Sequence, residues 1–315
     1  MSEGHAPAYG GHVHDGHSHG VSAEADQRYL SIALGLIVGF MVVEVVVALV
    51  SSSLALLADA GHMLTDIVAI AGSIWALRLA QRPASKTWSF GLKRAEILAA
   101  AVNGVTLLVV GILVFIEAVQ RLIDPPKVEG LPLVVVAIVG VGVNVVATLV
   151  LARANRTSLN VEGAFQHILT DLYGFIGTAI AGVVVIVTGW RRADPVASLV
   201  VVVLVLRTAW ALLKASGHIL LEGTPHTVDL DDVRNHICEL PDVIAVHDLH
   251  AWTLTSELPA LSAHVVITDA CLADGSAARL LDHLQHCLAN HFDVEHSTFQ
   301  LEAAGHADHE PGTHD

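Results

Sequence analysis

The chain has 315 residues, 53% of them hydrophobic, and a mean hydropathy of +0.61, which is too apolar for an ordinary soluble domain and indicates a membrane protein. Its formal net charge of −15 leaves no electrostatic reason to bind nucleic acid, so we expect no nucleic-acid partner. The three cysteines, Cys238, Cys271 and Cys287, lack C-x-x-C spacing and indicate neither a disulfide framework nor a thiolate metal site.

Residues 1–27 are polar and rich in His and Gly, with too little apolar surface to fold, so we predict a disordered tail. His12, His14, His17 and His19 lie close enough in sequence to hold zinc or nickel loosely and to release it quickly. The alternative is a solvated low-complexity segment with no role in metal binding.

Six apolar segments follow the tail, and each is about as long as the roughly 20 residues that a transmembrane helix needs. Prolines between several of them mark loops and helix starts. We therefore predict a six-helix transmembrane domain over residues 28–215, with helices at 29–50, 54–79, 95–123, 131–152, 159–188 and 194–213.

The second and fifth segments carry the same short motif. The second has His62 and Asp66, and the fifth has His167 and Asp171, each time with Leu-Thr directly before the Asp. Residues four apart lie on one face of a helix, so two such helices packed together would direct two nitrogens and two oxygens at one point, a set that suits zinc. An Asp in the middle of a membrane helix costs roughly 2.5–3.5 kcal/mol on insertion scales and commonly marks an ion pathway.

The alternative for these motifs is an ordinary polar contact between packed helices, which would explain one pair more easily than two similar ones. Asp59 precedes His62 by three residues and shares its helix face. We expect Asp59 to lie beside the site or at the mouth of its cavity rather than to bind the metal directly.

The basic residues predict the orientation of the helices. Residues 78–94 contain five Lys and Arg and residues 153–156 contain two, whereas the loops at the opposite ends contain four in all. Because Lys and Arg favour cytoplasmic loops, we predict that both termini are cytoplasmic.

After residue 215 the sequence becomes acidic, which indicates a soluble α/β domain over residues 216–303. The order αββαβ predicts a small sheet with helices on one face. Residues 304–315 are polar and contain three His, so we predict a second disordered tail. Periodicity predicts helices at 229–239 and 276–291 and strands at 243–254, 261–268 and 296–302.

The soluble domain contains a second set of possible metal ligands. We predict a site of three imidazoles and a carboxylate, from His247, His264, His296 and Glu302. His296 and Glu302 are an even number of residues apart and share a strand face, whereas His247 and His250 would face opposite ways in an unbulged strand. Whether Glu302 and His250 are ligands stays open, and the alternative is that these His are ordinary residues of the sheet surface.

At these motifs the sequence resembles the cation diffusion facilitator family of zinc transporters. The resemblance covers nearly the whole chain after the tail, and its motifs are specific when they occur together. They are LADAGHMLTD (residues 57–66), FGLKRAE (90–96), HILTD (167–171), HDLHAW (247–252) and LSAHV (261–265).

The resemblance implies a homodimer in a bacterial plasma (inner) membrane, with six transmembrane helices per subunit and a cytoplasmic metallochaperone-like domain. It implies a secondary transporter rather than an enzyme, which exports divalent metal in exchange for protons by alternating access. Zinc is the expected substrate, cadmium a possible second one, and zinc also the expected structural ion. By resemblance the transport site corresponds to His62, Asp66, His167 and Asp171, and the cytoplasmic site to His247, His264 and His296, with Glu302 less certain.

Two rival functions use the same residues differently. An intramembrane zinc hydrolase would need an open coordination position, which two His and two Asp would close, and the chain lacks the H-E-x-x-H motif. A membrane-anchored zinc sensor or binding protein without transport would need no His/Asp pairs inside its anchor. We therefore predict transport as the function.

Overall fold

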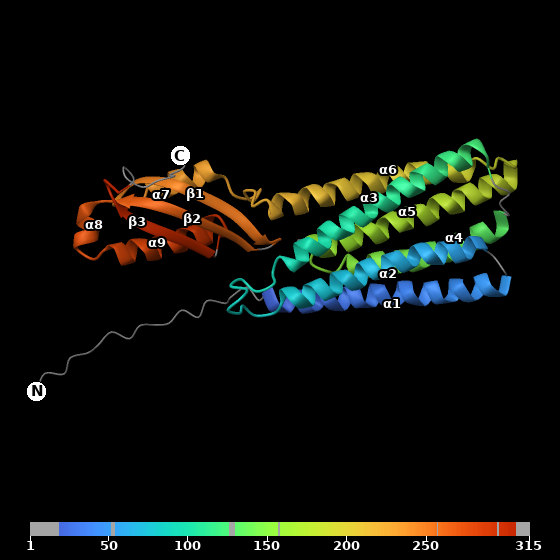
Figure 1. Ribbon diagram of the computed structural model, residues 1–315, viewed down its shortest axis with the longest axis horizontal. Helices are drawn as coiled ribbons and strands as arrows, with labels where there is room; N and C mark the ends of the chain where they lie inside the picture. Colours follow the sequence, from blue (N-terminus) through green and yellow to red (C-terminus); the bar gives the residue numbers. More distant parts are fainter. Residues whose placement is uncertain are drawn as a thin grey trace, which may run out of the picture.

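The computed structural model describes residues 19–51, 54–125, 130–156, 158–256, 258–294 and 296–306. Long helices run side by side in one part of the molecule, and a small α/β domain lies at one end of them (Figure 1). Within the described residues, six helices are long and apolar enough to cross a membrane. They are α1 (His19–Ser51), α2 (Leu54–Ala80), α3 (Ala95–Ile123), α4 (Gly130–Leu151), α5 (Leu159–Thr188) and α6 (Ala193–Leu220).

Two of these helices extend beyond their predicted ends. α1 begins at His19, inside the segment predicted to be disordered, where residues 22–28 contain good helix formers such as Ala, Glu, Gln and Arg. α6 continues to Leu220, past the end predicted at residue 213, because Leu212, Ser216 and Ile219 keep a buried stripe at helical spacing. Because these extensions contain polar residues, apolar runs alone did not predict them.

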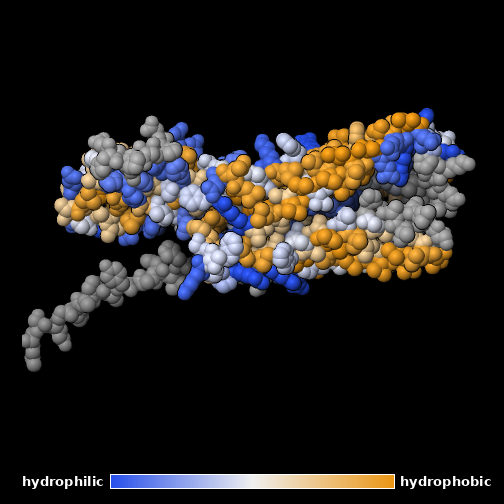
Figure 2. Space-filling view, viewed as in Figure 1, coloured by the Kyte–Doolittle hydropathy of each residue, from blue (hydrophilic) through white to orange (hydrophobic). Residues whose placement is uncertain are grey.

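The helices pack in neighbouring pairs, α3 with α6, α4 with α5, and α1 with α2. Glycines allow two of these close approaches. A Cβ on Gly140 would lie 2.5 Å from Cδ1 of Phe175, and one on Gly104 would lie 2.9 Å from Cγ of Leu213. Hydrophobic side chains cover the outer sides of the helices, as expected for a surface in contact with lipid (Figure 2).

The C-terminal domain contains α7 (Leu230–Cys238), β1 (Val243–Thr255), β2 (Leu258–Ile267), α8 (Asp269–Ala273), α9 (Ala277–His291) and β3 (His296–Ala303). β1 and β2 are antiparallel, and β3 joins β2 in parallel after the connection through α8 and α9. This confirms the predicted order αββαβ and adds α8, a short helix whose N-cap is Thr268. Residues from α7 and α9, among them Ile237, Leu284 and Leu288, form the core against one face of the sheet.

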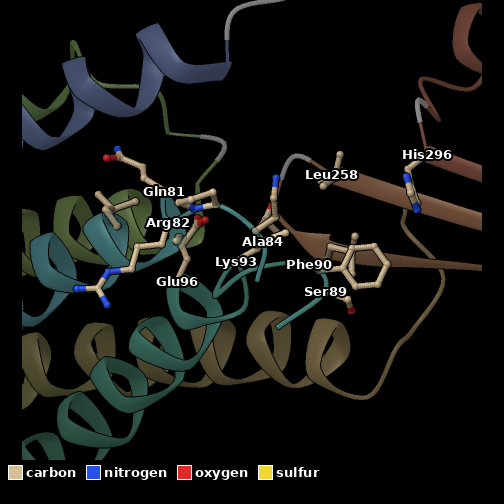
Figure 3. Close-up of a pocket in the computed structure, with 14 residues that line it drawn as sticks. Gln81, Arg82, Ala84, Ser89, Phe90, Lys93, Glu96, Leu258 and His296 are labelled. Atoms are coloured by element: carbon tan, nitrogen blue, oxygen red, sulfur yellow. The ribbon is translucent and has the colours of Figure 1, made fainter. Parts of the chain in front are cut away.

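The turn between β1 and β2 touches the helices at the end where α3 and α5 begin. The Glu96 carboxylate, nearly buried, accepts hydrogen bonds from the hydroxyls of Ser158 (2.6 Å) and Ser256 (3.2 Å). The Leu159 amide donates to the Ser256 hydroxyl at 3.0 Å. Figure 3 shows Glu96 of α3 and Leu258 of β2 around the same pocket at this junction. The strand turn is therefore bonded to the starts of two transmembrane helices.

Candidate metal centres

The first candidate centre lies between α2 and α5. Nε2 of His167 is 2.6 Å from Oδ1 of Asp66 and 3.7 Å from Oδ2 of Asp171. Asp66 comes from α2, whereas His167 and Asp171 lie one turn apart on α5. The three side chains can therefore offer one nitrogen and two oxygens to the same ion.

Buried and half-buried side chains form this centre, and the Thr65 hydroxyl donates to Oδ1 of Asp66 at 3.4 Å. His167 is 8% exposed, and the side chains of Asp66 and Asp171 are 18% and 31% exposed. The apolar neighbours include Met63, Ile70 and Ile168, which are all buried. Two carboxylates in such an environment need a cation or protons as compensation.

A hydrogen bond between helices sets the register of the centre. The buried Asn160 side chain donates to the backbone oxygen of Ser73 at 2.8 Å. Asn160 precedes His167 by seven residues and Ser73 follows Asp66 by seven, so this bond lies two turns, about 10 Å, from the ligands along both helices. Because α2 and α5 run in opposite directions, the equal spacing keeps Asp66 level with His167.

The other residues predicted for this centre are described only in part. The backbone places His62 on α2, one turn before Asp66, and Asp59 a further turn away. The side chains of His62 and Asp59 lie outside the part of the chain that the structure describes. Their roles, as fourth ligand and as neighbour of the site, stay predictions.

The second candidate centre lies on the sheet of the C-terminal domain. Glu302 of β3, 4% exposed, places Oε2 at 3.1 Å from Nε2 of His247 and Oε1 at 2.8 Å from Nδ1 of His264. His247 and His264 face each other on β1 and β2. Gln300 donates to Oε1 of Glu302 at 2.8 Å, which fixes the carboxylate. Glu302, the less certain member of the predicted set, is the residue that connects the two imidazoles.

His296 lies away from this group, contrary to the prediction. It pairs with Ala260 on β2, and its ring meets the edge of Phe90 at 5.6 Å between centroids (Figure 3). His296 and Glu302 do share a face, but six residues of strand span about 20 Å, so a common face does not make a common site.

A β-bulge changes the expected position of His250. His247 pairs with His264 and His250 pairs with Ser262, so β1 has one residue more than β2 in this interval. Asp248 in the bulge has a φ of 46°. The bulge puts His250 on the face of His247, but His250 is exposed and outside the group formed with Glu302.

Of the tail residues proposed as weak ligands, His12, His14 and His17 lie outside the described residues, and His19 is described only as the first backbone position of α1. The structure also brings together a group that the sequence analysis missed, made of His236, Cys287 and His291. The spacing of Cys287 and His291, four residues apart on one helix, was the signal available in the sequence.

Both parts of the chain match known domains of cation efflux proteins. Residues 30–221 match the family model of the cation efflux transmembrane domain, and residues 225–304 match that of the cytoplasmic domain of cation efflux proteins. The solved metal-bound C-terminal domain of the CzcD transporter is 40% identical, covers 24% of this chain and 99% of its own, and has a TM-score of 0.22.

Curated relatives match along nearly their full length. The zinc transporter ZitB of Escherichia coli is 40% identical over 92% of this chain and 92% of its own. The metal cation efflux system protein CzcD of Cupriavidus metallidurans is 40% identical over 92% and 90%. The cadmium, cobalt and zinc/H(+)-K(+) antiporter of Bacillus subtilis is 37% identical over 92% and 93%. With both of its parts matched, the chain belongs to the cation efflux, or cation diffusion facilitator, family.

Proposed function

We propose that this protein exports zinc, and with it cadmium, across a bacterial plasma membrane in exchange for protons. The observation that carries the proposal is the position of His167, buried between carboxylates of α2 and α5. The names of the relatives, a zinc transporter and a cadmium, cobalt and zinc antiporter, support the choice of substrate. A protein that merely bound metal through its C-terminal domain would need no such group between its transmembrane helices.

The exchange of metal for protons follows from the ligands. Zinc requires a neutral imidazole and ionised carboxylates, so metal and protons compete for the same atoms. Nε2 of His167 and Oδ1 of Asp66 lie within hydrogen-bond distance at 2.6 Å, so a shared proton and a zinc ion would compete for these two atoms. With His62 as fourth ligand, two carboxylates and one zinc ion leave no net charge, and so do two carboxylates and two protonated imidazoles.

Alternating access would convert this competition into transport. Open to a near-neutral cytoplasm, His62, Asp66, His167 and Asp171 lose protons and load zinc. Open to a more acidic exterior, the imidazoles gain protons and the zinc leaves. A change in the packing of α2 and α5 against their neighbours would switch the side to which the site opens, with both termini in the cytoplasm.

We further propose that the group of His247, His264 and Glu302 binds a structural zinc ion in the cytoplasmic domain of a homodimer. Its ligands lie on the sheet, away from the path between the helices, so this ion would stabilise the domain rather than cross the membrane. The family model for residues 225–304 is that of the cytoplasmic domain, which supports this location.

The test is zinc flux into proteoliposomes by the Asp171→Asn variant. This change keeps the shape of the side chain but removes its charge, so we expect flux to fall at least 100-fold. Asp194→Asn is the matched control, because Asp194 is also a transmembrane-helix acid but lies 3.8 Å from Arg121 and outside the group. Near-normal flux in Asp171→Asn would contradict the proposed site.

A further inference from the structure

A third group of metal-ligating side chains lies in the C-terminal domain where α7 meets α9. His236 comes from the last turn of α7, and Cys287 and His291 come from successive turns of α9. Nδ1 of His291 is 2.9 Å from Nε2 of His236 and 3.9 Å from Sγ of Cys287. The ligand atoms of all three lie within 4.8 Å of one another.

The fold holds this group in place from both helices. Val233 and Ile237 anchor α7 in the core beside His236, and Leu284 and Leu288 anchor α9 beside Cys287. The His236 ring meets the edge of the Phe292 ring at 5.7 Å between centroids, which restricts its rotation. The three ligands therefore stay close together as part of the folded domain.

The distances suit a tetrahedral ion. Zinc–sulfur bonds of about 2.3 Å and zinc–nitrogen bonds of about 2.0–2.1 Å place neighbouring ligand atoms about 3.3–3.6 Å apart. The observed 2.9 Å and 3.9 Å differ from these values by less than about half an ångström, which small side-chain rotations can supply. His291 is exposed, so water can reach the fourth position.

The sheet separates this group from the one around Glu302. Leu249, Ala251 and Ala263 fill the face of the sheet that α7 and α9 cover, whereas His247 and His264 lie on the other face. The two groups therefore cannot share an ion.

We propose that His236, Cys287 and His291 form a further binding site for a zinc-class divalent ion, with the thiolate of Cys287 as one ligand. A thiolate with two imidazoles suits zinc and cadmium and is unsuited to magnesium or calcium. Such an ion would link α7 to α9, and its open side would let it exchange with metal in solution. This proposal differs from the expectation, based on the missing C-x-x-C spacing, that the cysteines form no thiolate site.

The test is alkylation of the three cysteines in the purified full-length protein, mapped by mass spectrometry with and without cadmium. Burial raises the pKa of the Cys287 thiol, so the reaction is run at mildly alkaline pH. We expect cadmium to slow alkylation of Cys287 at least tenfold and to leave the exposed Cys238 unaffected. Protection should be lost when both His236→Ala and His291→Ala are present and kept in His286→Ala, an exposed control on the same helix.

Three results would overturn the proposal: no protection of Cys287, equal protection of Cys238, or full protection without the two histidines. The buried Cys271 reports on folding, because it becomes reactive if the domain opens. If the C-terminal domain unfolds in the double variant, the site is tested instead by the ultraviolet absorption of cadmium–thiolate bonds. That absorption should be present in the parent protein and absent in Cys287→Ser, and its persistence in Cys287→Ser would contradict the site. None of these measurements depends on transport.

Discussion

His167 is the residue at which the chemistry of the proposed transport site is concentrated. One of its nitrogens faces two carboxylates from two helices, at 2.6 Å and 3.7 Å. A hydroxyl in that position would not give the same exchange, since His changes charge near neutral pH and also binds zinc when neutral. The same property makes His264 a suitable ligand on the sheet, where Glu302 takes the place of the two Asp.

At the residue scale, His264→Ala should show that zinc binding on the sheet and zinc transport between the helices are independent. We expect the variant to bind about one zinc ion fewer per chain while transport stays within about threefold of normal, because the sheet site lies outside the transport path. Equilibrium dialysis and vesicle flux on the same preparation measure the two quantities. His250→Ala is the control, since His250 lies on the same face but outside the group. Complete loss of transport in His264→Ala, with normal zinc binding between the helices, would contradict this separation.

Residue types and their spacing predicted the three described members of the first centre, Asp66, His167 and Asp171, but only part of the second. Residues four apart on a helix are adjacent whatever the fold, so His167 and Asp171 could be paired from the sequence. On a strand, the spacing of two residues determines only whether their side chains lie on the same face of the sheet. His296 was therefore grouped with Glu302, although about 20 Å of strand separates them. The bulge that turns His250 to the face of His247 has only a weak signal in the sequence, an Asp inside a strand, Asp248, which tolerates a positive φ.

At the element scale, the contact between α2 and α5 depends on few polar links. Asn160 donates across to Ser73 and so keeps the ligands of the two helices level. Elsewhere the helices approach through glycines, as at Gly140 against Phe175. The bounds of α3 and α5 agree with the sequence, since apolar runs define them. α1 and α6 continue through polar residues, which good helix formers explain in α1 and a buried stripe explains in α6.

Asn160→Ala should weaken zinc transport without unfolding the protein. A hydrogen bond between transmembrane helices contributes about 0.6–2 kcal/mol, so we expect a loss of roughly 3- to 30-fold in apparent zinc affinity. Asn144→Ala is the matched control, because Asn144 is equally buried but donates to the oxygen of Gly140 in its own helix at 3.0 Å. The affinity is measured from vesicle flux against zinc concentration. Equal effects of the two substitutions would show that the register between α2 and α5 does not matter.

At the scale of the whole molecule, the C-terminal domain is attached to the transmembrane helices through specific bonds. Glu96 joins Ser158 and Ser256, and Arg94 forms an ion pair with Glu222 at 2.9 Å. These contacts connect the start of α3, the start of α5 and the segment after α6. This junction is therefore one route by which metal bound in the C-terminal domain would influence the helices.

We propose that one site between α2 and α5 exchanges zinc for protons. The most direct measurement is zinc uptake into proteoliposomes with an imposed pH gradient, alongside the pH inside the vesicles. With an acidic interior we expect zinc to accumulate and the interior to become more alkaline as protons leave, and both changes should vanish in Asp171→Asn and when an ionophore collapses the gradient. Zinc uptake at the same rate and to the same level with and without the gradient would contradict the exchange of zinc for protons.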